Sequence, residues 1–150
     1  MTSAVSQGNV PVEVRIGLLR DRVIEGPIEH DVRRGRDGWR YVGDGRGGRV
    51  RYDGWRDVLH IESPAGTVRI RFRWRNTTFM WRGRTYRIQP SAWGRVTILD
   101  GNRPVVQGRL TLSGIRLDSV DPEFRDIERE LAFGLAQRAT TIAMVVAVAH

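Results

Sequence analysis

The chain has 150 residues, of which 40% are hydrophobic and 28% are charged, so it can bury a core as one domain without cross-links. It contains no cysteine, which excludes a disulfide framework, cysteine-ligated zinc and thiol catalysis. The net charge is +8, and all 25 basic residues are arginine. Selection for anion binding and the codon bias of a GC-rich genome would both favour arginine over lysine.

The excess positive charge lies in the middle of the chain. Residues 63–116 hold 11 arginines and a single acid, Asp100, for a net charge of +10. Residues 1–62 carry +1 and residues 117–150 carry −3. Because a block of one sign attracts anions over a long range, this block is the expected site of an anionic partner.

The N-terminal segment is expected to lie outside the folded domain. Residues 1–10 are small and mostly polar, without the basic and apolar regions of a signal peptide, so we expect a flexible tail and a cytoplasmic protein. Residues 11–150 are expected to form a single domain.

Glycine interrupts the sequence from Pro11 to Leu117 so often that no long helical pattern fits there. Short runs typical of strands lie between the glycines, and this spacing predicts an antiparallel barrel or sandwich. Asp100-Gly101-Asn102 is a predicted hairpin turn, because glycine and asparagine accept positive φ. The predicted strands are Val12–Leu19, Trp39–Val42, Arg49–Tyr52, Val58–Glu62, Thr67–Arg75, Thr78–Trp81, Arg84–Gln89, Arg95–Leu99, Val105–Leu112 and Ile115–Leu117.

A helix is predicted over residues 122–149. It begins at Asp121-Pro122-Glu123, with an acid at the N-cap and proline at the first helical position. From Ala139 to Ala149 it is apolar on every side, so this part is buried in protein or in lipid. Its length of about 16 Å is roughly half of a bilayer's hydrocarbon core, so we expect burial in the protein and no membrane span.

These elements predict a mostly β fold, an antiparallel β-barrel of about ten to twelve short strands that encloses the hydrophobic C-terminal helix. A barrel of this width is not filled by its own side chains, so the apolar end Ala139–Ala149 is expected to thread the lumen, with the acidic start of the helix at the mouth. The alternative is a pleckstrin-homology-like sandwich capped by a C-terminal helix. That helix is usually amphipathic, whereas this one is apolar all round over its last third.

Three short motifs followed by the helix carry a family resemblance. They are Trp81–Ile88 (WRGRTYRI), Trp93–Gly101 (WGRVTILDG) and Val105–Gly108 (VVQG). In this order they resemble the tubby C-terminal-like superfamily, which includes the LURP-one-related proteins and the phospholipid scramblases, over roughly residues 66–150. The resemblance implies a closed barrel of about a dozen strands around a hydrophobic helix, and a lipid-binding role near membranes.

The most regular strand pattern places arginines on one face of Thr67–Arg75. Apolar side chains alternate with four arginines there, which predicts one buried face and one charged face. The apolar set is Val68, Ile70, Phe72 and Trp74. Acids on a neighbouring strand would neutralise the charged face if Asp53, Asp57 and Glu62 paired with it. With two arginines from the following segment, the candidate anion-binding residues are Arg69, Arg71, Arg73, Arg75, Arg82 and Arg84.

No catalytic, metal or cofactor site is expected from the sequence. His30, His60 and His150 lack the spacing of metal ligands, and the chain has no P-loop, dinucleotide fingerprint or nucleophile elbow. The leading hypothesis is a non-enzymatic barrel that binds acidic lipid headgroups or an acidic protein through its arginine-rich outer face, peripheral to a membrane at most.

Two other classes of function are open. Aromatic residues interleave with arginine, as in Trp39-Arg40-Tyr41, Trp74-Arg75 and Trp81-Arg82. If aromatics and arginines share one face, this favours nucleic-acid binding, which the basic block 63–116 also supports. An enzyme with an unrecognised cleft would instead place perturbed titratable groups in a concave pocket.

Overall fold

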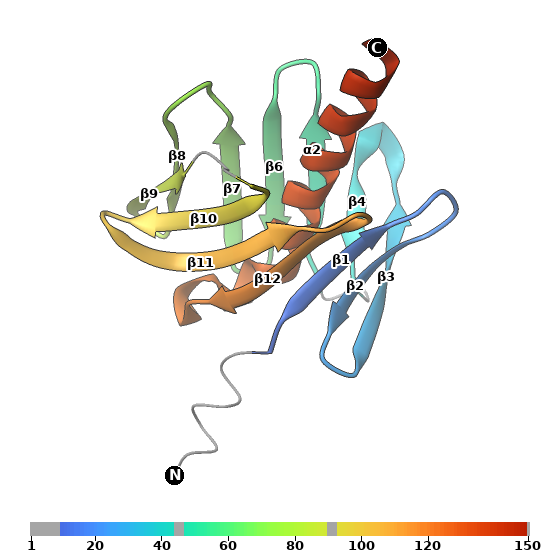
Figure 1. The fold of residues 1–150 in the computed structure, drawn as a ribbon. Coiled ribbons are helices and arrows are strands. Elements are labelled where there is room, and N and C mark those ends of the chain that lie inside the picture. Colours follow the sequence, from blue (N-terminus) through green and yellow to red (C-terminus); the bar gives the residue numbers. More distant parts are fainter. Residues whose placement is uncertain (1–9, 44–46, 90–92, 150) are drawn as a thin grey trace.

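The barrel and its helix account for nearly the whole chain. The computed structural model describes residues 10–43, 47–89 and 93–149 (Figure 1). Within this part of the chain, twelve strands form one antiparallel sheet that curls into a nearly closed barrel, so the predicted barrel is confirmed and the pleckstrin-like sandwich is excluded. The strands are β1 (Val12–Ile16), β2 (Asp21–Glu25), β3 (Ile28–Arg34), β4 (Arg40–Val42), β5 (Arg49–Asp53), β6 (Val58–Ser63), β7 (Gly66–Arg71), β8 (Thr77–Trp81), β9 (Arg84–Gln89), β10 (Arg95–Asp100), β11 (Arg103–Leu110) and β12 (Gly114–Val120).

Strand order follows chain order except at one ladder. β1 pairs with β12, so the two edges of the sheet are β7 and β8. These edges pack against each other, and a Cβ at Gly66 of β7 would lie 3.1 Å from the Trp81 ring of β8. The barrel is therefore closed by side-chain packing at the β7–β8 seam.

Because the strands form a meander, successive hairpins alternate between the two ends of the barrel. Those after β2, β4, β6, β8 and β10 lie at one end, which we call the closed end. The 3₁₀ helix η3 (Pro122–Ile127) is anchored there: the Trp81 indole donates to the Glu123 carbonyl at 2.7 Å and the Tyr86 hydroxyl donates to its carboxylate at 2.6 Å. Asp121 lies at the predicted N-cap position, but its side chain makes no capping hydrogen bond. It instead accepts a hydrogen bond from Arg103 at 3.1 Å.

The hairpins after the odd-numbered strands lie at the other end, which we call the helix-exit end. The helix α2 (Glu128–Ala149) emerges there beside the β5–β6 hairpin (Figure 1), and the loop between β7 and β8 lines a cavity against the helix. A Cβ at Gly54 in the β5–β6 hairpin would lie 3.4 Å from Thr141 of the helix. The β11–β12 hairpin borders a groove of about 350 Å³ against Ala139–Ala147, so several hairpins surround the emerging helix.

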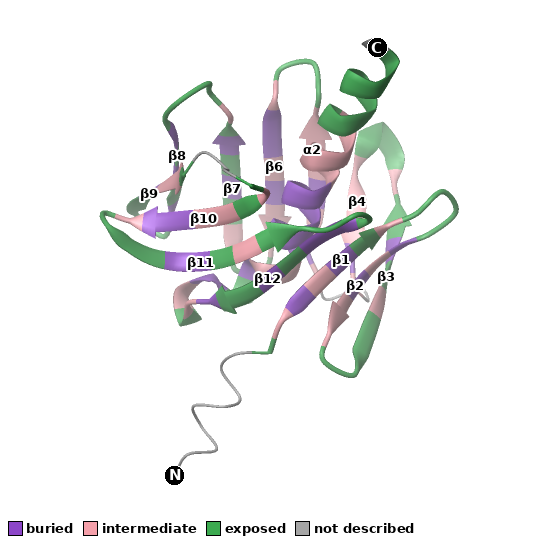
Figure 2. Cartoon of the chain, viewed as in Figure 1, coloured by how far each residue is buried: buried purple, intermediate pink, exposed green. Residues whose placement is uncertain are grey.

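The lumen is filled by the first half of the helix. Phe124 and Ile127 of η3 are fully buried, and every residue of α2 from Glu130 to Ala136 is buried. From Ile142 to Val148 every residue is exposed (Figure 2). The expectation that Ala139–Ala149 threads the barrel is therefore wrong. Strands of five or six residues, tilted across the barrel, are spanned by only about ten helical residues, so the apolar end projects beyond them.

An ion pair marks the point where the helix leaves the barrel. The Arg138 guanidinium donates to both carboxylate oxygens of Asp57, at 2.8 and 2.9 Å, and the Tyr52 hydroxyl donates to the same carboxylate at 2.6 Å. Arg138 also lies over the Phe72 ring at 4.0 Å. Burial alone would raise the pKa of Asp57, but the hydrogen bonds from Arg138 and Tyr52 outweigh it and lower that pKa. The carboxylate therefore stays ionised and holds the helix to the β5–β6 hairpin.

Three predicted strands extend too far. The predicted strand Val12–Leu19 ends at Ile16, because the Gly17 amide donates to the Asp21 carboxylate and the chain turns into β2. Neither β2 nor β3 was among the predicted strands. Thr67–Arg75 ends at Arg71; Val68 and Ile70 are buried as expected, whereas Trp74 is in the following loop and 89% exposed. The predicted strand Val105–Leu112 also ends early, at Leu110, so Leu112 is exposed in the following turn. The predicted turn at Gly101, with φ of 61°, is confirmed.

The contrast between the two halves of the helix gives a first prediction. Leu131→Asp places an unpaired charge in the filled lumen and is expected to destabilise the fold by at least about 4 kcal/mol, whereas Met144→Asp, at an exposed position, is expected to change stability by less than about 1 kcal/mol. Chemical denaturation of both variants measures the difference. Equal destabilisation would contradict the position assigned to the second half of the helix.

Candidate anion-binding face

Arginine and aromatic side chains meet on the outer surface of β3–β7. In the ladders, Arg33 stands opposite Tyr41, and Tyr41 opposite Arg49. In the next row, Arg51 stands opposite His60, which stands opposite Arg69. Their strand neighbours are buried inside the barrel, so these side chains face outward. We call this surface the arginine face and define it as Arg33, Trp39, Tyr41, Arg49, Arg51, His60, Arg69 and Arg71.

The aromatic rings of this face lie under guanidinium groups. The guanidinium carbon of Arg49 is 4.0 Å from the centre of the Trp39 ring, and that of Arg51 is 5.2 Å from it. Arg33 lies 5.0 Å from the Tyr41 ring. Cation–π contacts of this kind hold the arginines in place. The aromatics and arginines thus share one surface.

A hollow of about 450 Å³ opens on this surface beside the β3–β4 hairpin. Its lining holds one acid, Asp37, among its arginines and two aromatic rings. The side chains that give the hollow its character are Arg33, Arg34, Arg36, Arg49, Trp39 and Tyr41. A site with this charge and shape fits a phosphate or carboxylate group, which several planar guanidinium groups can bind together.

The acids whose pairing was the alternative to anion binding by β7 are engaged elsewhere. Glu62 accepts from Arg49 at 2.8 Å, Asp53 accepts the backbone amides of the β5–β6 turn, and Asp57 holds the helix. Among the described acids, none forms an ion pair with Arg69 or Arg71. The β7 side of the face therefore keeps its positive charge.

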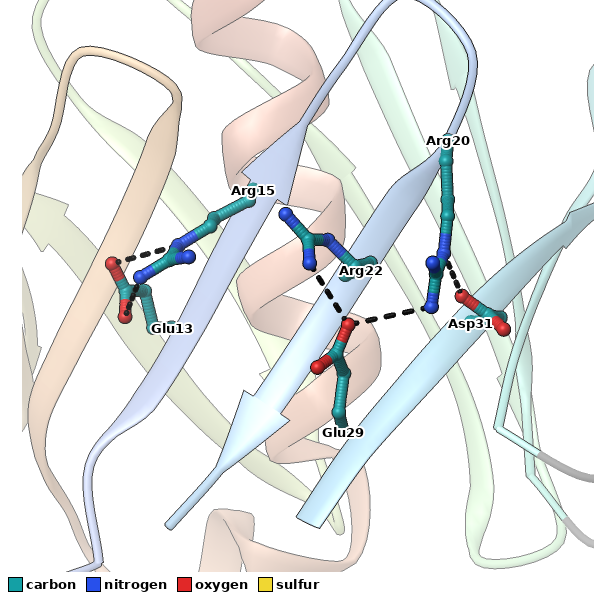
Figure 3. Close-up of polar contacts among 6 residues, drawn as sticks. All are labelled: Glu13, Arg15, Arg20, Arg22, Glu29 and Asp31. Atoms are coloured by element: carbon teal, nitrogen blue, oxygen red, sulfur yellow. Dashed lines mark hydrogen bonds and ion pairs between the residues drawn. The ribbon is translucent and has the colours of Figure 1, made fainter. Parts of the chain in front are cut away.

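The neighbouring wall of the barrel, on β1–β3, is different, because its arginines are matched with acids. On β1–β3, Arg15 pairs with Glu13, Arg22 pairs with Glu29 at 3.0 Å, and Arg20 bridges Glu29 and Asp31 (Figure 3). This wall and most of the arginine face both belong to residues 1–62, whose net charge is +1. The two surfaces differ because the arginines of β1–β3 have acidic partners, whereas Arg69 and Arg71, from the +10 block, have none among the described acids.

The six arginines identified in the sequence, Arg69, Arg71, Arg73, Arg75, Arg82 and Arg84, lie in three places. The first two belong to the arginine face. The next two follow β7 in the loop and border a cavity of about 260 Å³ against the helix. The last two lie at the closed end, where Arg82 pairs with Asp126 at 2.5 Å and Arg84 pairs with Asp100 at 3.1 Å. The six do not form one site, because β7 ends at Arg71 and the β8–β9 hairpin carries Arg82 and Arg84 to the closed end.

The pKa of His60 reflects the positive charge of the arginine face. Burial lowers this pKa, and the neighbouring guanidinium groups of Arg51 and Arg69 lower it further. The Nε atom of Arg51 is buried and has no hydrogen-bond partner. The middle of the face therefore has a positive potential, which favours an added anion.

A separate cluster of carboxyl groups lies inside the barrel wall. Burial raises the pKa of Glu128 to about 8, assisted by a hydrogen bond with Glu25, and burial raises that of Glu130 to about 7. Glu25 also contacts His30 at 3.4 Å and Arg129 at 3.3 Å. Sequence reasoning had no signal for this cluster, because Glu25 and Glu128 are brought together only by the closed barrel. Among the described residues no three potential ligands converge as a metal site requires.

The carboxyl cluster predicts that stability falls as the pH rises. The folded chain keeps protons on Glu128 and Glu130 that the unfolded chain releases near pH 4.5, so their contribution declines from about pH 4.5 to about pH 8. Glu130→Gln, which removes the titrating group, is expected to stabilise the fold by about 1–3 kcal/mol at pH 8 and by little at pH 4.5. Denaturation of both proteins across this range tests it; parallel stability profiles would contradict the buried position of this carboxyl.

Comparisons of the chain with protein-family models, curated proteins and solved structures return no match. Among the described residues, one helical stretch, Pro122–Val148, is long and apolar enough to cross a membrane, and 33% of its most apolar window is buried in the fold. The function must therefore be argued from the surface and the helix themselves.

Proposed function

We propose that the protein is a non-enzymatic barrel that binds acidic lipid headgroups through its arginine face, peripherally at a membrane. The observation that carries this proposal is the set of arginines without acidic partners on β7, next to a hollow lined by arginine and aromatic side chains. Phosphate and carboxylate groups of acidic lipids are the anions that guanidinium pairs bind best. Such lipids are abundant on the cytoplasmic leaflet, so a cytoplasmic location suits this function.

The family resemblance supports the same class of partner. Residues 66–150 resemble the tubby C-terminal-like superfamily, and a closed barrel around a C-terminal helix is the architecture that this resemblance implies. We propose membership of that superfamily on this basis. The lipid class comes from the analogy, and the arginine face gives it a place in this chain.

Nucleic acid is the second candidate, and one observation favours it. Trp39 and Tyr41 share a surface with arginines, as single-strand binding platforms require. However, Arg49 lies over the Trp39 ring at 4.0 Å, so a base would have to displace it before stacking. Acidic lipids need no such displacement, and we favour them for that reason.

The proposal is tested by removing charge from one side of the barrel at a time. The triple variant Arg33→Gln, Arg69→Gln, Arg71→Gln is expected to bind phosphatidylserine-containing vesicles about 100-fold more weakly, because each arginine near such a surface contributes about 1 kcal/mol. The matched control, Arg15→Gln, Arg22→Gln, Arg116→Gln, loses the same charge from paired arginines and is expected to bind like the parent. Co-sedimentation with vesicles at low and moderate salt measures both.

Three outcomes would contradict the proposal. Equal weakening in both triple variants would show that net charge alone governs binding. Parental binding by the first variant would show that the arginine face is not the contact surface. Stronger binding to a single-stranded oligonucleotide than to acidic vesicles, with a steep salt dependence, would favour nucleic acid instead.

A second prediction uses His60 as a reporter within the folded protein. Inorganic phosphate bound between Arg51 and Arg69 would offset their repulsion of the protonated ring, so the pKa of His60 is expected to rise. NMR titration of the histidine ring protons, with and without phosphate, measures the change. His30, which contacts Glu25 away from this surface, is the internal control. A pKa of His60 that does not respond to phosphate would contradict anion binding at this row.

A further inference from the structure

The helix-exit end of the barrel presents large apolar side chains at most of its hairpin tips. In the described chain, the hairpins after β1, β5, β7, β9 and β11 each carry a tryptophan or leucine that is almost completely exposed. These residues are Leu18 (98%), Leu19 (97%), Trp55 (97%), Trp74 (89%), Trp93 (98%) and Leu112 (110%). They are far apart in sequence, and only the alternation of hairpins in the meander brings them to one end.

The projecting part of the helix adds to this apolar end. From Ile142 to Val148 every residue is exposed and none is polar. The exposed fractions of Met144 and Val148 are 64% and 87%. This segment rises about 10 Å, less than the roughly 15 Å hydrocarbon thickness of one leaflet, and its backbone groups are satisfied within the helix. It can therefore enter a leaflet without spanning the bilayer.

The charges next to the tips suit an acidic membrane surface. Arg56 follows Trp55, and Arg73 and Arg75 flank Trp74. The nearby acids Asp53 and Asp57 are already bonded, to the β5–β6 turn and to Arg138. Tryptophan prefers the boundary between hydrocarbon and headgroups, and arginine prefers the phosphates just above it.

The remaining hairpin at this end, between β3 and β4, carries the hollow of the arginine face. Its 3₁₀ turn Arg36–Gly38 contributes to the wall of the hollow, and Arg71 is the last residue of β7 before the loop that holds Trp74. The positive surface and the apolar tips are thus continuous. One membrane can contact both.

We propose that the helix-exit end inserts into the outer part of a lipid leaflet, with the Trp and Leu hairpin tips and Ile142–Val148 in the apolar layer and the adjacent arginines at the headgroups. This inference rests on the proposed function, since it adds an apolar contact to the headgroup contact with the same bilayer. The partner that fits this end is the membrane itself. The apolar tips around the projecting helix match the hydrocarbon layer, and the arginines beside them match the acidic headgroups above it.

The experiment measures quenching of tryptophan fluorescence by brominated phosphatidylcholine vesicles, with and without phosphatidylserine. The parent is expected to be quenched on acidic vesicles. Trp74→Ser with Leu112→Ser is expected to bind at least tenfold more weakly in moderate salt, with reduced quenching. The matched control, Ile28→Ser with Met80→Ser, removes two exposed apolar side chains away from the helix-exit end and is expected to behave like the parent. Thermal unfolding of each variant confirms that the fold is retained.

Met144→Asp with Val148→Asp tests the helix separately. Both positions are exposed, so the barrel is expected to remain folded while quenching falls at least severalfold. Unchanged quenching in this variant and in the tip variant would overturn the proposal.

The other outcomes separate this inference from the proposed function. A parent that binds acidic vesicles without quenching would refute insertion and leave headgroup binding intact. Quenching that survives loss of Arg33, Arg69 and Arg71 at full strength would support insertion and refute the arginine face as the headgroup site. Failure to bind any vesicle would overturn insertion. A lipid-free dimer that the tip variant dissociates would then show that a second copy of the chain covers this end.

Discussion

The ion pair between Arg138 and Asp57 is the constraint on which the rest of the molecule depends. It joins the helix to the β5–β6 hairpin at the last point where the helix is inside the barrel. The Arg138 guanidinium donates one hydrogen bond to each carboxylate oxygen of Asp57. Sliding the helix by one turn would therefore leave two charges partly buried and unpaired. The pair therefore determines which residues fill the lumen and which project. With the helix fixed in this register, Phe133 is buried and Met144 is exposed.

This register gives the two ends of the barrel different chemistry. The closed end is polar and most of its charged groups have partners: Tyr86 and Trp81 bond to Glu123, and Arg82 pairs with Asp126 of η3. Hydrogen bonding to Glu123 and burial raise the pKa of Tyr86 to about 12, burial being the larger cause, so its hydroxyl remains a donor at neutral pH. The helix-exit end has apolar tips and arginines that lack such partners. The molecule therefore has one end completed by its own contacts and one end suited to an external surface.

The architecture was predictable from sequence because it depends on local signals. Closely spaced glycines, alternation within strands and the long apolar helix are readable in a single chain, and the turn at Gly101 follows from its neighbours. The extent of burial along the helix was not predictable, because it depends on the height of the barrel, which is a property of all twelve strands together. The same apolar pattern, Ala139–Ala149, suits a lumen and a projecting segment equally well.

The candidate site was only partly predictable for a related reason. Arg69 and Arg71 follow from alternation in one strand, but Arg33 and Arg51 join them through ladders between strands, and single-sequence reasoning does not give that register. The motif Trp39-Arg40-Tyr41 was the available signal for the hollow. It could not show that Arg49 and Arg33 would lie over its rings. The regular alternation of residues 67–75 predicted a strand longer than β7, and this placed Trp74 on the buried face.

The ladder between β1 and β12 has a consequence for how the chain reaches this state. It pairs Val12 with Leu117, whereas every other ladder joins strands that are neighbours in sequence. Closing a loop of that length costs about 4 kcal/mol of chain entropy, and hairpins between neighbours avoid most of this cost. The meander can thus form piece by piece, but the cylinder closes only when the two distant strands meet, after both halves of the sheet exist. Because non-local contacts slow folding, we expect this pairing to form late, and the helix that follows β12 directly to be enclosed with it.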